Sequence, residues 1–302
     1  MQSSVLSEKR FDVHRAITDK IIAAMEGGAG DFVMPWHRQG PGAGRPTNAL
    51  TLSTYRGVNV VALWAEALTR GYGSGWWATF NQWKELGARV LKGEHGAMIV
   101  FYKSLAGPAD ESLEDDERPL LMARAYRVFN KDQVDGWRPP QAPTANPVVI
   151  LAEVEAFVTS TAADVRHGGD TACYRANLDV IDMPPQVAFQ DTGTSSATEA
   201  YYATLLHELT HWSGAKHRLD REFGGRFGAD GYAMEELVAE LGAAFLCADL
   251  RITNEPRPDH AAYLSSWLSV LRADRRAIFT AAQKANEATA FLAALSAGTP
   301  PF

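Results

Sequence analysis

The sequence predicts an α+β protein with two domains, one of them mixed α/β and the other mostly helical. Three observations support this. The chain has 302 residues, which is long enough for two separate cores. A proline-rich segment without periodicity, residues 137–147, divides it. Helices alternate with strands in the first part, whereas helical periodicity dominates the second. We therefore expect a domain over residues 1–136, a linker over 137–147 and a second domain over 148–302.

Composition limits the class of protein. Hydrophobic residues make up 46% of the chain and charged residues 22%, as in ordinary globular proteins. No run of about 18 apolar residues occurs, so no membrane span is expected, and residues 1–15 lack the apolar core of a secretory signal. Cys173 and Cys247 have apolar neighbours and no C-x-x-C spacing. We expect both thiols to be reduced core residues of a cytoplasmic protein.

Charge is distributed unevenly. Residues 1–137 hold 16 basic and 16 acidic residues, but six of the acids lie within residues 110–117, and without them this part has a net charge of +6. Residues 138–302 hold 13 basic and 20 acidic residues. A polyanionic partner would therefore be bound by the first part.

The N-terminal elements follow from periodicity. Apolar residues at helical spacing predict helices over residues 11–25 and 58–68, and a short helix is expected from Trp76 to Leu86. Strands are expected over residues 97–102 and 122–129, on either side of an acidic loop at 104–119.

Aromatic and basic residues are interleaved in this part of the chain. Single-stranded nucleic acid binds to surfaces where aromatic rings stack on bases and Lys or Arg contacts phosphates. The alternative is that many of these rings belong to the core. The candidate DNA contacts are Trp36, Tyr55, Arg56, Trp76, Trp77, Lys84, Arg89, Lys92 and Lys103.

The C-terminal elements surround one helix. A helix is expected over residues 148–158, followed by a β-hairpin of strands 171–176 and 179–183 that can line a cleft and pair with an extended peptide. Tyr174 in this hairpin either packs or stabilises an oxyanion. The sequence Ser196-Ala197-Thr198-Glu199 is a capping box that begins the central helix. A buried helix over residues 233–250 and two more over 259–273 and 274–296 complete the domain.

The central helix contains H-E-x-x-H, formed by His207, Glu208 and His211. Histidines four residues apart lie on one helix face, so both imidazoles can bind one Zn²⁺. Glu208 can act as the general base on a zinc-activated water. This arrangement predicts a zinc peptidase-type site. A structural zinc site would need a cysteine-rich ligand set that the chain lacks.

The third ligand has several candidates. Glu236 and Glu240 share a face of the 233–250 helix, so we assign Glu236 to the metal and Glu240 to a hydrogen bond that orients a ligand histidine. Glu235 is the next candidate. His217 completes the spacing H-E-x-x-H-x-x-G-x-x-H in full. Against His217 stand the otherwise unexplained acids of the buried helix and the lack of any methionine after residue 234.

Two sets of motifs together resemble ArdC-type antirestriction proteins. In the second part, H-E-L-T-H-W-S-G and E-E-L-V-A-E look like a zincin-like peptidase domain of the gluzincin type. In the first part, the similar segments are Pro35-Trp36, Asn48-Ala49, Tyr55-Arg56-Gly57-Val58-Asn59, Trp64, Trp77-Ala78-Thr79-Phe80-Asn81-Gln82 and Lys92-Gly93-Glu94.

The resemblance implies an N-terminal domain that binds single-stranded DNA and protects incoming plasmid or phage DNA from host restriction. It also favours Glu236 over His217 as ligand, and it implies Zn²⁺ or another divalent metal as cofactor. The expected partners are single-stranded DNA and a protein or peptide substrate, with no membrane. The alternatives are an intracellular zinc peptidase with a protein-recognition domain, and a DNA-binding protein with a non-catalytic metal site.

Overall fold

The structure is a computed structural model of the whole chain. It describes residues 11–28, 34–37, 44–104, 121–140, 147–192, 195–223, 230–253 and 260–298. Most of the acidic loop and residues 141–146 of the expected linker therefore lie outside the described residues. Among the helices that are described, none combines the length and hydropathy that a membrane span requires.

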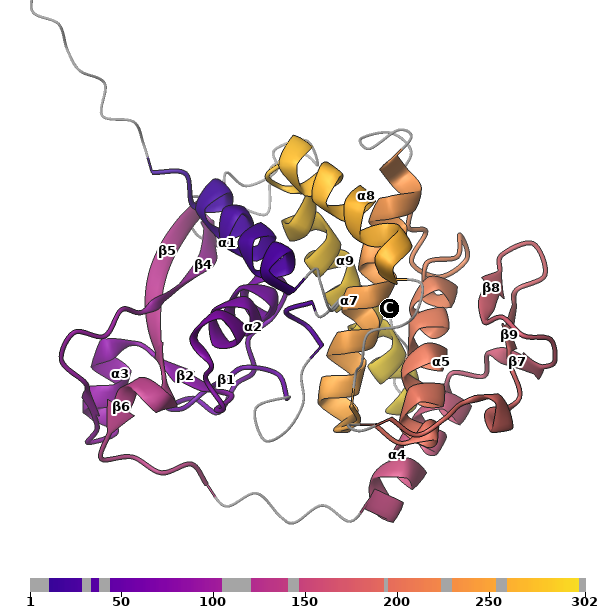
Figure 1. Cartoon of the computed structure of the whole chain (residues 1–302), viewed down its shortest axis with the longest axis horizontal. Coiled ribbons are helices and arrows are strands. Elements are labelled where there is room, and N and C mark those ends of the chain that lie inside the picture. Colours follow the sequence, from indigo (N-terminus) through magenta and orange to yellow (C-terminus); the bar gives the residue numbers. More distant parts are fainter. Residues whose placement is uncertain are drawn as a thin grey trace, which may run out of the picture.

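The N-terminal part combines helices with a small sheet (Figure 1). Its elements are α1 (Val13–Gly28), β1 (Thr47–Asn48), α2 (Val58–Arg70), β2 (Trp76–Ala78), α3 (Phe80–Glu85), β3 (Arg89–Val90), β4 (Ala97–Ser104), β5 (Leu121–Asn130), the 3₁₀ helix η3 (Lys131–Gln133) and β6 (Val134–Asp135). The main sheet has the strand order β1-β2-β5-β4. The predicted strands at 97–102 and 122–129 are confirmed as the long antiparallel pair β4–β5.

One N-terminal prediction is wrong. The expected helix from Trp76 is instead strand β2, which pairs with β1 on one side and β5 on the other. The helix begins only after Thr79, whose side chain forms a capping box with Gln82. Strand pairing at both edges, together with that cap, moves the start of the helix to Phe80.

The C-terminal part packs helices around α7. Its elements are α4 (Pro147–Ser160), β7 (Asp164–His167), β8 (Cys173–Arg175), β9 (Val180–Met183), the 3₁₀ helix η4 (Gln186–Ala188), α5 (Ala197–Ser213), α7 (Gly231–Leu250), α8 (His260–Ala273) and α9 (Ala277–Ser296). Figure 1 shows α7 between α5 and α9, with the small sheet on the outer side of α5. The predicted helices are all present with small shifts in their ends, and the Ser196–Glu199 capping box begins α5 as expected.

The small sheet contains the predicted hairpin and one strand that the sequence did not indicate. β8 and β9 pair antiparallel, and β7 adds to β9 in parallel, giving the order β7-β9-β8. β7 has the sequence D-V-R-H and is mostly exposed, so it carries no alternating apolar pattern. β8 is one of the two edge strands, and a hydrogen bond from Tyr174 to Glu208 joins it to α5.

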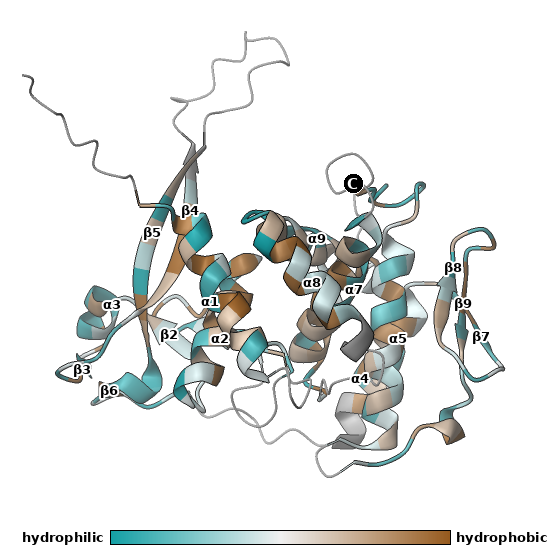
Figure 2. Ribbon diagram, turned by 45° about the horizontal axis from the view of Figure 1, so that its top comes forward, coloured by the Kyte–Doolittle hydropathy of each residue, from teal (hydrophilic) through white to brown (hydrophobic). Residues whose placement is uncertain are grey.

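A continuous apolar core joins the two parts. It contains residues of α1, α2 and β4 together with residues of α7, α8 and α9. Trp36 stands edge-on to Trp267 at 6.2 Å, and Trp64 lies 5.8 Å from Phe245. The brown, apolar faces of these helices turn toward one another in Figure 2. The N-terminal part is therefore packed directly against α7, the helix that carries the predicted ligand Glu236.

Helices α5 and α7 approach closely at Gly242. A Cβ atom on Gly242 would lie 2.4 Å from Thr210 Cγ2 and 2.7 Å from Thr210 Oγ1. Thr210 is buried, and its hydroxyl donates to the carbonyl oxygen of Leu206. Only glycine lets the two helices pack at this distance, which brings Glu236 of α7 near the histidines of α5.

We expect Gly242→Ala to destabilise the fold despite the better helix propensity of alanine. Propensity favours alanine by about 1 kcal/mol, whereas overpacking a tight core costs about 1–3 kcal/mol. The expected net loss is about 1 kcal/mol or more in urea denaturation. In a Thr210→Ala background the cost should fall by at least half, because the clashing atoms are gone. An equal cost in both backgrounds would contradict this account of the helix contact.

Candidate metal centre

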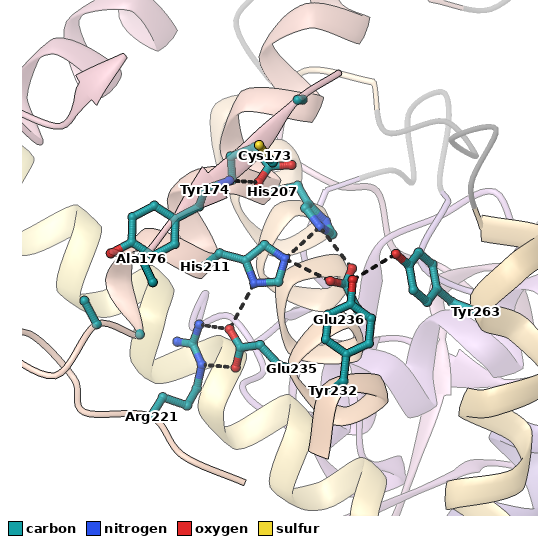
Figure 3. Close-up of a pocket in the computed structure, with 14 residues that line it drawn as sticks. Cys173, Tyr174, Ala176, His207, His211, Arg221, Tyr232, Glu235, Glu236 and Tyr263 are labelled. Atoms are coloured by element: carbon teal, nitrogen blue, oxygen red, sulfur yellow. Dashed lines mark hydrogen bonds and ion pairs between the residues drawn. The ribbon is translucent and has the colours of Figure 1, made fainter. Parts of the chain in front are cut away.

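Helix α5 presents His207, Glu208 and His211 to one pocket. The two histidines are labelled in Figure 3. The two histidine rings are one helical turn apart, with centroids separated by 4.8 Å. Their Nε2 atoms lie 3.1 Å from each other. Both rings therefore direct the same nitrogen to one point, as H-E-x-x-H predicts.

Helix α7 adds the carboxylate of Glu236. Glu236 Oε2 lies 3.6 Å from His207 Nε2, and Glu236 Oε1 lies 3.5 Å from His211 Nε2. Metal–ligand bonds of about 2.0–2.2 Å in a tetrahedral site place neighbouring ligand atoms about 3.3–3.6 Å apart. The three side chains form the one group of potential metal ligands among the described residues. Their spacing fits a divalent ion with an open fourth position.

Glu235 is not among these ligands, because it contacts the other side of His211. Its Oε1 lies 3.0 Å from His211 Nδ1. Arg221 holds this carboxylate with two hydrogen bonds, from Nε at 2.8 Å and from Nη2 at 2.6 Å. A proton on Nδ1 leaves Nε2 of His211 free to bind a metal. Glu235 thus orients a ligand, the role that the sequence suggested for Glu240.

The buried guanidinium of Arg221 passes beside Gly214, where a Cβ atom would lie 2.6 Å from its Nη2. The same Nη2 donates to the carbonyl oxygen of Thr210. Glycine at position 214 therefore leaves room for the Arg221 side chain. It is not followed by a third histidine ligand, because His217 is not in the ligand group. The sequence carried a signal for Gly214 but none for Arg221.

Acids and histidines of the site stabilise each other's charges. Burial lowers the pKa of His211, but hydrogen bonds to Glu235 and Glu236 outweigh this and raise the pKa to about 9. Burial raises the pKa of Glu236, yet hydrogen bonds from His207 and His211 leave it well below its usual range. The pKa of Glu235 is likewise lowered, because its hydrogen bonds from Arg221 and His211 outweigh burial.

Metal affinity should therefore depend on pH. His211 with a pKa near 9 keeps a proton on Nε2 at neutral pH in the metal-free protein, and a metal must displace it. We expect zinc affinity to rise about tenfold per pH unit between about pH 6 and pH 8, with proton release on binding. Competition with a chromophoric chelator measures this, with His217→Gln as control. Constant affinity over that range would contradict the protonation state assigned to His211.

His217 lies outside the ligand group. It is exposed, and its Nε2 lies 3.2 Å from Asp179 Oδ2. Asp179 also pairs with Arg218, whose guanidinium lowers the pKa of Asp179 to about 2 and stacks over Trp212 at 3.7 Å. The complete metzincin-like spacing in the sequence therefore does not place His217 near the other two histidines.

The edge strand β8 borders the pocket, as the hairpin predicted. The backbone N–H of Tyr174 donates to Glu208 Oε2 at 2.9 Å. The Tyr174 hydroxyl donates to Asp179 Oδ1 at 2.9 Å and accepts from Arg218. The side chain also packs against the apolar cluster that contains α5, so it has a packing role. Cys173 is exposed on the same strand, which corrects the expectation that it fills the core. Cys247 is buried as expected.

The pocket has a volume of about 400 Å³ and contains two tyrosines that the sequence analysis did not identify. The hydroxyls of Tyr232 and Tyr263 lie 3.1 Å apart, beside Glu236 (Figure 3). They come from α7 and α8, and neither stands in a recognisable motif. Phenol O–H groups in this position can donate to an oxyanion.

Glu240 is buried one turn beyond Glu236. Its Oε2 lies 3.7 Å from His207 Nδ1. Its Oε1 accepts hydrogen bonds from the N-terminal part, from Trp36 at 3.1 Å and from His37 at 2.9 Å. The assignment of Glu240 beside a ligand histidine fits this position, but the two donors were not foreseen.

Three of the predicted DNA contacts do not reach the surface of the protein. Trp36, Tyr55 and Trp77 are buried, so no base can stack on them, and these three assignments are corrected. Trp76 is half-buried against Trp137. Four of the predicted basic contacts are exposed, namely Arg56, Lys84, Arg89 and Lys92. The side chain of Lys103 lies outside what the structure describes.

Comparison with known proteins identifies both parts of the chain. Residues 11–129 match the family model described as the N-terminal domain of anti-restriction factor ArdC. Residues 152–284 match the model of a zincin-like metallopeptidase. The boundaries predicted from the linker remain a prediction, although both matches lie within them.

Relatives match over nearly the whole chain. A Sinorhizobium fredii protein named y4eC is 48% identical over 281 residues, which cover 91% of this chain and 90% of that protein. An Escherichia coli DNA primase, TraC, is 32% identical over 93% of this chain, although the match covers only 20% of TraC.

Solved structures of the antirestriction protein ArdC from plasmid R388 are also similar. The metal-free form is 38% identical with a TM-score of 0.75, and the match covers 96% of this chain and 99% of that one. The Mn(II)-bound form, also 38% identical, has a TM-score of 0.73, with 95% of this chain and 99% of that one covered. A metal-bound relative and the zincin-like domain both indicate a divalent metal. With both domains matched in order, this chain belongs to the ArdC family of antirestriction proteins.

Proposed function

We propose that this protein is a cytoplasmic antirestriction protein that binds single-stranded DNA, carries a zinc-dependent peptidase-type site and protects incoming plasmid or phage DNA from host restriction. The observation that carries the proposal is the convergence of His207, His211 and Glu236 beside Glu208, in a chain that matches ArdC over 96% of its length. An inert metal site would not need a buried carboxylate next to the open position.

The residues of the pocket suit peptide hydrolysis. A bound Zn²⁺ supplies an electrophile that acidifies water and polarises a carbonyl group. Glu208 can take the proton of the attacking water and deliver it to the leaving amine. The outer edge of β8 can pair with an extended peptide, and the hydroxyls of Tyr232 and Tyr263 can donate to the developing oxyanion.

For the DNA, we propose a contact surface on β4 and β5, termed the outer strand face and formed by Phe101, Arg124 and Tyr126. Phe101 and Arg124 are direct cross-strand partners. The rings of Phe101 and Tyr126 meet edge-to-face at 5.5 Å, and both remain about half exposed, at 51% and 42%. Exposed rings beside an exposed arginine provide stacking surface and a phosphate contact together.

We expect the double substitution Phe101→Ala/Tyr126→Ala to weaken single-stranded DNA binding by about 10- to 100-fold, because each stacked base contributes about 1–3 kcal/mol. Fluorescence anisotropy with a labelled oligonucleotide at several salt concentrations measures this. The matched control is Phe80→Ala, which removes an exposed phenylalanine from α3. Full affinity in the double variant would exclude the outer strand face as the contact.

The function itself is tested by DNA transfer. Unmodified plasmid DNA is introduced by conjugation into a restricting host and into an isogenic non-restricting host, with and without the protein. We expect the protein to raise transfer only into the restricting host. An equal yield with and without the protein would contradict antirestriction, and zinc-dependent proteolysis without DNA binding would favour the alternative of a plain peptidase.

A further inference from the structure

The segment Pro35-Trp36-His37 enters the C-terminal helices from the N-terminal part. The indole of Trp36 and the ring of His37 are buried, and Trp36 packs on Trp267 of α8. The indole nitrogen of Trp36 and the Nε2 atom of His37 both face Glu240 of α7. Trp36, which the sequence suggests as a DNA contact, is therefore part of the packing around the metal centre.

The hydrogen bonds of this segment define which nitrogen of His37 carries the proton. The Met34 N–H donates to His37 Nδ1 at 2.9 Å, so the ring carries its proton on Nε2. That Nε2–H and the Trp36 Nε1–H both point to Glu240 Oε1, at 2.9 and 3.1 Å. A buried carboxylate is costly unless it accepts hydrogen bonds, and these two donors satisfy one of its oxygens.

The other carboxylate oxygen of Glu240, Oε2, faces the predicted metal ligand His207. Oε2 lies 3.7 Å from His207 Nδ1, and among the described residues this buried nitrogen has no hydrogen-bond partner within normal distance. A shift of about 0.5 Å brings the two atoms within the ~3.2 Å limit of an ordinary N–H···O hydrogen bond. A histidine that binds a metal through Nε2 donates its Nδ1–H to an acceptor of this kind.

We propose that Trp36 and His37 are positioning residues of the metal centre. They hold Glu240 so that its Oε2 receives the Nδ1–H of His207, which keeps His207 Nε2 directed at His211 and Glu236. The N-terminal domain thus completes the metal site of the peptidase domain. This inference rests on the proposed metal site and concerns metal affinity, so it does not depend on a peptide substrate.

The test measures affinity of the full chain for Zn²⁺ by competition with a chromophoric chelator. Trp36→Phe removes the N–H donor and keeps a ring in the core. The matched control is Trp64→Phe, since Trp64 lies in the same core and its indole N–H donates to the Gly44 carbonyl and not to Glu240. We expect about tenfold weaker binding in Trp36→Phe, within the range known for partners of ligand histidines, and no change in Trp64→Phe.

A double-mutant cycle separates positioning from general loss of packing. Glu240→Gln should weaken binding about 10- to 100-fold, and Trp36→Phe should then add nothing, because it acts through the Glu240 carboxylate. His37→Gln retains an N–H donor and should bind more tightly than His37→Leu. This second pair serves the same purpose if Trp36→Phe fails to fold.

The outcomes are distinct. If the wild type binds Zn²⁺ but Trp36→Phe and Trp64→Phe bind equally, or if Trp36→Phe has the same effect in the Glu240→Gln background, the inference is wrong and the metal site stands. If the wild type does not bind Zn²⁺ at all, the proposed function fails and the inference fails with it.

Discussion

Glu236→Gln is expected to lower zinc affinity by about 10²- to 10³-fold, so that the purified protein no longer holds a stoichiometric ion. The carboxylate lies 3.6 and 3.5 Å from the two histidine Nε2 atoms and comes from a separate helix. A structural zinc site is worth about 10–16 kcal/mol for four ligands, or about 3 kcal/mol for each one. A neutral amide oxygen cannot replace the anionic ligand.

Two further variants make this measurement specific. Glu235→Gln should weaken binding by only about tenfold, since Glu235 orients His211 and does not contact the ion. His217→Gln should leave affinity unchanged. Metal analysis after dialysis gives the bound zinc per protein, and chelator competition gives the zinc affinity of each variant. Loss of metal in His217→Gln with retention in Glu236→Gln would reinstate the metzincin-like ligand set.

Glu208→Gln is expected to reduce peptide cleavage by about 10²- to 10⁴-fold while leaving the metal bound, the usual range for loss of a general base. The side chain lines the same pocket as the ligands, and its carboxylate accepts the N–H of Tyr174. Glutamine keeps the size and a hydrogen bond but cannot take a proton. Mass spectrometry of a pool of unstructured peptides, with zinc-loaded protein, measures cleavage.

The control is Glu287→Gln, which changes a glutamate on α9 outside the pocket. Undiminished cleavage in Glu208→Gln would show that Glu208 is not the base. The same variant tested in DNA transfer separates the two activities. If protection from restriction persists, hydrolysis is not the activity that protects the DNA.

Local sequence patterns are sufficient to predict the residues at the centre of the metal site. The spacing of His207 and His211 places both rings on one face in any α-helix, and the capping box at Ser196 fixes where α5 begins. Glu236 could be chosen as a candidate because a carboxylate on a buried helix needs a partner. These inferences depend on residues within one helix or on general costs of burial.

The errors arose where a distant segment determines the outcome. Trp36 and Trp77 were expected at a DNA surface, but contacts across the domain boundary and within the sheet bury them. Trp76 was assigned to a helix because its pairing with β1 and β5 is not visible in local periodicity. Glu235 was considered as a ligand because nothing in the sequence indicates that Arg221 holds it against His211.

The ligand set is tested most directly by anomalous diffraction at the zinc edge from crystals of the zinc-loaded protein. We predict one ion bound by His207, His211 and Glu236, with Glu208 facing its open position. An ion bound by His217, or a pocket without an ion at saturating zinc, would contradict the central claim.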